Sequence, residues 1–164
     1  MIEQIENSAL STWIREGTDI YGYTLILSCH AIGLAIVVGT ATAISLRLLG
    51  FPKEIPLAAV RKIFPVTMFG FWLNAISGLL LYMTEINKMN AMPAFWGKIG
   101  SIAIGMTLLL IIRKRIFGNE SVERGIVPAG GRGLAWAMLA CWYSALIIGR
   151  LTGYPQMVER YFGI

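Results

Sequence analysis

The sequence predicts an all-α protein, an integral membrane four-helix bundle with a short N-terminal interfacial helix. Of its 164 residues, 56% are hydrophobic and only 14% are charged, and the mean hydropathy is +0.66. A soluble domain carries roughly 25% charged residues. Between clusters of charge lie four apolar stretches of roughly 20 residues, the length that a helix needs to cross a bilayer. Because an open sheet cannot span lipid, these stretches are expected to be helices.

We expect one domain over residues 1–164, built from a surface helix and four spans. Residues 2–16 place apolar side chains at nearly helical spacing, which favours a helix lying on the outer surface of the membrane with Trp13 among the headgroups. The first residues are acidic and do not form a secretory signal peptide, so the first span is expected to direct insertion. The spans are expected at residues 21–49, 64–82, 94–112 and 133–151.

Small and polar residues inside the spans indicate how the helices pack. The first span carries a stripe of small residues spaced four apart, where another span or another subunit can approach closely. This stripe consists of Ala31, Ala35, Gly39 and Ala43. Asn74 lies near the middle of the second span and is expected to donate a hydrogen bond to another helix.

The net charge of +5 is spread unevenly along the chain. Nine of the 14 Lys and Arg residues lie in or beside two loops, one between the first two spans and one between the last two. The positive-inside rule places both loops in the cytoplasm and both termini outside. We expect no nucleic-acid partner, because no soluble domain presents a basic patch. The second loop is rich in glycine but contains no recognisable phosphate-binding loop.

His30 is the only histidine, and it lies within the first span. An imidazole in lipid is expensive to keep, so it is a candidate functional site. At about 1.5 Å per residue, His30 lies roughly 8 Å outward of the midplane, at the level expected for residues 77–78 of the second span. Lys98 and Arg150 are expected about a turn closer to the outer surface.

These positions suit haem b, which offers an iron to one imidazole and two propionates to basic side chains. His30 is then the axial ligand, Lys98 and Arg150 lie near the propionates, and Tyr82 and Trp96 contribute packing walls. Such a protein would transfer electrons to an unknown redox partner or bind a small ligand. A single histidine leaves the second axial position to a methionine, to His30 of another subunit, or open.

Other functions remain open from the residues alone. His30 can be a structural or proton-relay residue, hydrogen-bonded to a neighbouring helix. Chlorophyll accepts a single imidazole, and copper accepts histidine, cysteine and methionine. A cofactor-free structural or transport subunit of a membrane complex is the competing class, although no acidic residue lies deep in a span, which argues against a proton-coupled carrier.

The stretch from His30 to Gly39, followed by Leu46-Arg-Leu-Leu-Gly50, resembles the first span of a family of small bacterial four-helix membrane proteins of unknown function. Further matches are Phe64-Pro65, Gly70-Phe71, Ser77-Gly78-Leu79, Met92-Pro93-Ala94-Phe95, Lys98 and Gly149-Arg150-Leu151. The chain is more distantly similar to membrane bundles of the copper-resistance protein D and cytochrome b561 type. The resemblance implies a four-helix membrane fold and points to the positions His30, Lys98 and Arg150. We expect a multi-pass protein of the bacterial inner membrane with both termini on the outer, periplasmic side, and a homo-oligomer. Family members often carry a further histidine near the end of the third span, which this chain lacks.

Overall fold

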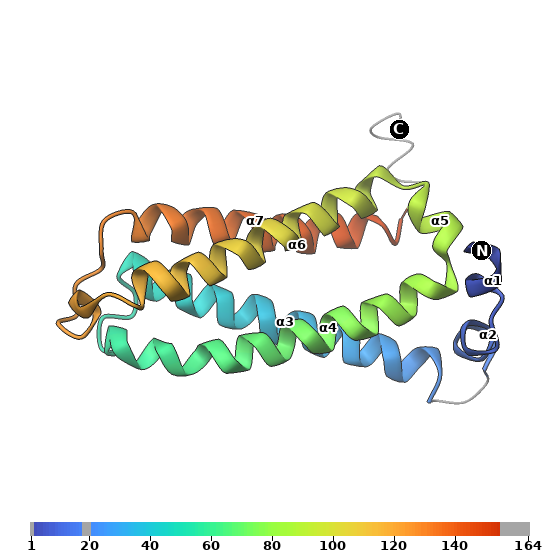
Figure 1. Ribbon diagram of the computed structural model, residues 1–164, viewed down its shortest axis with the longest axis horizontal. Coiled ribbons are helices and arrows are strands. Elements are labelled where there is room, and N and C mark those ends of the chain that lie inside the picture. Colours follow the sequence, from blue (N-terminus) through green and yellow to red (C-terminus); the bar gives the residue numbers. More distant parts are fainter. Residues whose placement is uncertain (1, 18–20, 155–164) are drawn as a thin grey trace. The chain divides into compact units, whose positions relative to one another are not determined.

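The computed structural model describes residues 2–17 and 21–154, and every regular element in those ranges is a helix (Figure 1). The predicted all-α fold is confirmed. Contacts divide the chain into two compact units, which are described in turn. The first unit takes in residues up to Val37 together with Val66–Met92, and the second takes in Val38–Pro65 together with the residues from Pro93 onward.

Four helices are long and apolar enough to cross a membrane, which makes this a multi-pass membrane protein. They are α3 (Tyr23–Leu49), α4 (Phe64–Thr84), α6 (Pro93–Ile111) and α7 (Gly131–Leu151). The four predicted spans are therefore confirmed, with each end within two residues of its predicted place. Shorter elements connect them: η1 (Leu57–Ile63), α5 (Ile86–Asn90), η2 (Ile112–Ile116) and η3 (Glu120–Val122).

The N-terminal segment forms two short helices where the sequence predicted one over residues 2–16. These are α1 (Ile2–Glu6) and α2 (Ala9–Glu16). The helix breaks because Ser8 has an extended backbone and its hydroxyl caps α2, accepting a hydrogen bond from the Ser11 amide at 3.3 Å.

In the first unit the N-terminal helices are tied to the end of α4 and to α5. The Ser11 hydroxyl donates to the Met83 carbonyl at 3.0 Å, and the Asn87 amide donates to the Glu6 carboxylate at 2.6 Å. Ile14 is fully buried, whereas Trp13 remains exposed and available to lipid headgroups.

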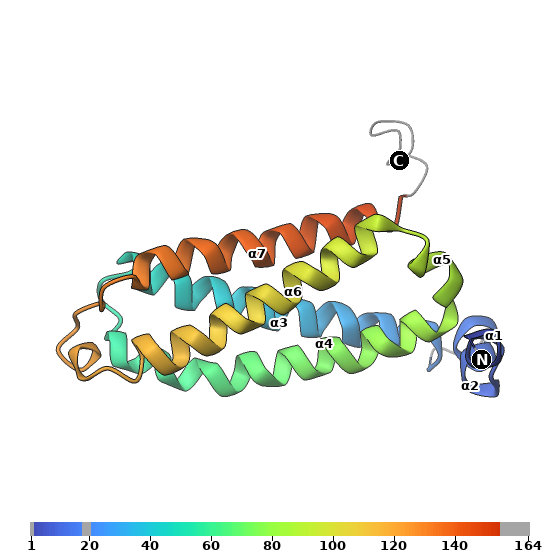
Figure 2. The ribbon, with the colours of Figure 1, turned by 45° about the horizontal axis from the view of Figure 1, so that its top comes forward.

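In the same unit the first half of α3 lies beside α4, and glycines let the two backbones approach (Figure 1 and Figure 2). A Cβ built on Gly33 would lie 2.5 Å from the backbone nitrogen of Asn74. A Cβ built on Gly70 would lie 2.5 Å from the side chain of Ile36. A methyl group at either position would force the helices apart.

The buried face of α3 differs from the stripe of small residues that the sequence singled out. All four residues of that stripe, Ala31, Ala35, Gly39 and Ala43, are exposed in the structure. The buried row runs two residues out of step with it: Gly33, Val37, Ala41 and Ser45. Both rows have four-residue spacing, so the spacing alone did not identify the buried one.

In the second unit α6 and α7 pack side by side (Figure 2). Gly105 of α6 faces the indole of the buried Trp142 of α7, and a Cβ on Gly105 would lie 3.2 Å from that ring. In the same unit, Arg61 joins η1 to the segment between α6 and α7. Its guanidinium donates to the Phe117 carbonyl at 2.8 Å and pairs with the Glu123 carboxylate at 2.5 Å.

Candidate functional site

His30 lies on α3 in the first unit, half-buried against α4. Its Nδ1 is 3.0 Å from the backbone oxygen of Asn74 and 3.3 Å from the hydroxyl of Ser77. Gly78 leaves room for the ring, because a Cβ there would lie 2.9 Å from Cε1 of His30. The predicted level of His30, beside residues 77–78 of the second span, is therefore confirmed.

The contacts of Nδ1 indicate which ring nitrogen carries the proton. The Asn74 carbonyl can only accept a hydrogen bond. The Ser77 hydroxyl has a single proton, and it donates this proton to the Leu73 carbonyl at 2.6 Å, so toward His30 it acts as an acceptor. The Asn74 amide nitrogen, which is a donor, also lies 3.3 Å from Nδ1, but the Asn74 carbonyl is closer at 3.0 Å. The closer, acceptor-only carbonyl favours the neutral tautomer with the proton on Nδ1 and the basic lone pair on Nε2.

Asn74 also bonds back to the helix that carries His30. Its amide nitrogen donates to the His30 backbone oxygen at 2.8 Å and lies 3.3 Å from Nδ1. The interhelical donor predicted at Asn74 is confirmed. Each residue thus uses its side chain to bond the backbone of the other, and we call this reciprocal pair the His30–Asn74 clasp. Asn74 is 8% exposed and the neighbouring Ser77 is 4% exposed, whereas His30 is half-buried.

Lys98 and Arg150 lie together in the second unit, at the same end of α6 and α7. The aliphatic part of Lys98 runs along the backbone of Gly149. A Cβ built on Gly149 would lie 3.2 Å from the Lys98 side chain. The Arg150 guanidinium donates to the Tyr154 hydroxyl at 2.7 Å and lies 4.9 Å from the centre of its ring. Because His30 belongs to the first unit, the role of these two residues toward a ligand of His30 stays a prediction.

The two aromatic residues predicted as packing walls also fall in different units. Tyr82 of the first unit donates its hydroxyl to the Asn90 side chain at 2.9 Å, which joins α4 to α5. Trp96 of the second unit is 55% exposed and packs edge-on against Phe95, with ring centres 5.5 Å apart. Their role as packing walls stays a prediction.

Ser77 is a contributor that the sequence did not single out as a partner of the imidazole. The signal for it was the three-residue spacing from Asn74, which puts both side chains on one face of α4. Among the described residues no group of three or more His, Cys, Asp and Glu side chains could hold a metal ion.

Comparisons with known proteins do not extend this description to a family. No protein-family model, curated protein or solved structure matches the chain. The four long apolar helices identify the chain as a multi-pass membrane protein.

Proposed function

We propose that this protein binds haem b in the membrane, with Nε2 of His30 as an axial ligand to the iron. The observation that carries the proposal is the pair of acceptors at Nδ1, the Asn74 carbonyl and the Ser77 hydroxyl. Metal-ligating histidines nearly always donate their other ring N–H to a carbonyl, a carboxylate or water, which fixes the tautomer and orients the ring. This arrangement fits a histidine that ligates through Nε2.

The protein's own residues would hold and orient the ligand. The Asn74 carbonyl and Ser77 hydroxyl would keep the imidazole in one orientation and raise the basicity of Nε2. Lys98 and Arg150 are the proposed partners of the propionates, since both offer cationic donors to carboxylates. Bound haem would supply one-electron transfer or binding of a small molecule at an open axial position.

Optical spectroscopy of the purified full chain tests this proposal. The wild-type protein is expected to show a Soret band, and His30→Ala should lose it. Exogenous imidazole should restore the band to His30→Ala, because free imidazole can replace the missing side chain as a ligand to the iron. His30→Asn is the matched control, since its amide can still donate to Asn74 but cannot replace the imidazole at iron. A colourless wild-type protein without iron contradicts the proposal, and strong red absorption indicates chlorophyll.

A cofactor-free structural subunit is the second candidate, and the reciprocal bonds of the His30–Asn74 clasp favour it. On this alternative the imidazole only joins α3 to α4. His30→Asn should then retain most of the stability that His30→Ala loses, with no optical change in either variant. The same two variants therefore separate a ligating histidine from a packing one.

We also propose that the protein is a homo-oligomer in a bacterial inner membrane, associated through the exposed stripe on α3. Support comes from the four small residues at this stripe, which let a second helix approach closely. Ala35→Leu should convert an oligomer to a monomer in light scattering of the detergent-solubilised protein. A wild-type monomer contradicts this part of the proposal.

A further inference from the structure

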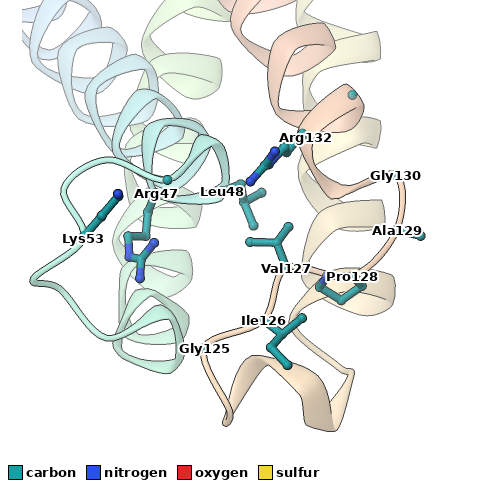
Figure 3. A pocket seen from close by; sticks show the side chains of 12 residues that line it. Arg47, Leu48, Lys53, Gly125, Ile126, Val127, Pro128, Ala129, Gly130 and Arg132 are labelled. Atoms are coloured by element: carbon teal, nitrogen blue, oxygen red, sulfur yellow. The ribbon is translucent and has the colours of Figure 1, made fainter.

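A pocket of about 620 Å³ lies in the second unit, where α3 ends and α7 begins. Figure 3 shows that its walls come from two distant stretches of chain, the turn after α3 and the segment leading into α7. Three basic residues line it, Arg47, Lys53 and Arg132, and no Asp or Glu is among its lining residues. Cations gathered in one concave site attract an anion more strongly than the same charges scattered over a surface.

The first wall is shaped by the way α3 ends. Gly50 has a φ of +107°, and the bonds from the Gly50 amide to Arg47 and from the Phe51 amide to Leu46 form a Schellman motif. This turn reverses the chain and brings Lys53 back beside the helix. The Arg47 Nε then donates to the Ile55 carbonyl at 2.6 Å, so the returning loop holds the guanidinium in place.

The second wall is the start of α7. Gly130 occupies the N-cap position with a φ of +80° and supplies no capping side chain, and Arg132 and Gly133 of the first turn of α7 line the pocket. Gly125 has a φ of +75°, and it also lines the pocket. All the positive-φ glycines of the described ranges therefore belong to this one site. The N-terminus of a helix of 21 residues adds partial positive charge to the three basic side chains.

In the part of the chain that the structure describes, the basic residues of the pocket form no ion pair. Within residues 2–17 and 21–154, ion pairs are formed by Arg15, Arg61 and Lys88, and none by Arg47, Lys53 or Arg132. In Figure 3 Arg132 extends from the start of α7 toward Leu48, whereas Arg47 and Lys53 come from the facing stretch. The hydrogen bond to Ile55 uses the Nε–H of Arg47, which leaves the terminal amino groups of its fork for an outside acceptor.

We infer that this pocket binds a phosphate group, and that the headgroup of an anionic phospholipid supplies it. Arginine forks match phosphate oxygens in geometry as well as in charge. The pocket lies at the ends of two membrane-spanning helices, where headgroups are found. Exposed apolar side chains accompany it, with Phe51 68% exposed beside the pocket and Ile126 57% exposed on its wall, and both suit the apolar region beneath the headgroups. The inference does not rest on haem binding.

Thermal unfolding of the full chain in detergent, with added lipid, tests this site. Short-chain phosphatidylglycerol should stabilise the protein at lower concentrations than phosphatidylcholine of the same chain length. The variant with Arg47→Gln, Lys53→Gln and Arg132→Gln should need about tenfold or more phosphatidylglycerol for the same stabilisation. The matched control neutralises Arg113, Lys114 and Arg115, exposed basic residues that do not line the pocket, and should differ much less from wild type.

Each other outcome overturns a defined part of the inference. If the two triple variants respond alike, or if both lipids act equally, the pocket is not a phosphate site. If inorganic phosphate protects as well as phosphatidylglycerol at matched ionic strength, the ligand is a soluble phosphate and the lipid assignment is wrong. Should the triple variant not fold, the double variant of the exposed Lys53 and Arg132 retains the Arg47–Ile55 bond and must still lose affinity.

Discussion

Two serines with no exposed surface, Ser11 and Ser45, differ in whether the buried hydroxyl has a hydrogen-bond partner. The Ser11 hydroxyl donates to the Met83 carbonyl at 3.0 Å. The Ser45 hydroxyl is buried without a hydrogen-bond partner in the described part of the chain. A buried polar group without a partner costs free energy, whereas a bonded one contributes to stability. The two residues are of the same type and equally buried, so they form a natural matched pair.

Replacing these serines by alanine is expected to change stability in opposite directions. Ser11→Ala should lower the free energy of unfolding by about 1 kcal/mol, because the Met83 carbonyl loses its donor. Ser45→Ala should leave it unchanged or raise it by up to about 1 kcal/mol, because an unsatisfied hydroxyl is removed. Reversible unfolding in mixed micelles, followed by tryptophan fluorescence, measures both. A loss at Ser45 as large as that at Ser11 would show that the Ser45 hydroxyl is bonded.

The sequence could predict the level of His30 along the neighbouring helix, but not which groups contact its ring. Its position in an apolar run and its level in the membrane follow from spacing along one helix, and the structure confirms that level. The acceptors at Nδ1 depend on how α4 is rotated about its own axis. They also depend on the close approach of α3 and α4, which requires glycine at positions 33 and 78. No local sequence pattern specifies that approach.

Among the helices, α3 shows most clearly why hydropathy predicts spans better than faces. The helix is apolar all round, so its ends follow from composition. Its buried face does not follow from composition, since two parallel rows of residues share the same four-residue spacing. The row containing Gly33 is buried, and the row containing Gly39 is exposed.

The close approach at Gly33 gives a prediction for the packing of α3. Gly33→Ala should destabilise the protein by about 1–3 kcal/mol, because the added methyl meets the Asn74 backbone at a distance that no relaxed contact allows. Gly100→Ala on α6 is the control, since a Cβ there meets nothing within 4 Å and alanine favours the helix. Unfolding midpoints in mixed micelles measure the difference. Equal midpoints for the two variants would contradict the close approach at Gly33.

At the scale of the whole molecule, the hydropathy pattern predicted the number of membrane-spanning helices and nearly all of their ends. It could not predict the basic pocket, although both loops that build it were recognised as basic. Arg47 and Arg132 are far apart along the chain, and they come together only through the ending of α3 and the left-handed turn at Gly130. Charge counts describe each loop separately, whereas a pocket requires their pairing.

The orientation of the chain in the membrane gives a further prediction. An even number of spans puts both termini on one side, and the basic loops should be cytoplasmic. Alkaline phosphatase fused to the C-terminus should therefore be active, because the enzyme folds only outside the cytoplasm. A fluorescent protein inserted between η3 and α7 should be fluorescent in the same cells. An inactive phosphatase fusion with normal expression would reverse the assigned orientation.

The hydrogen bond between Ser11 and Met83 can form only after much of the chain has been synthesised. Its two residues are 72 positions apart, so the acceptor does not exist when the donor leaves the ribosome. At about 5–20 residues per second, the delay is roughly 4 to 14 s. During that interval the Ser11 hydroxyl lacks this acceptor. Helix α2 can therefore dock on the end of α4 through this bond only after Met83 has been synthesised.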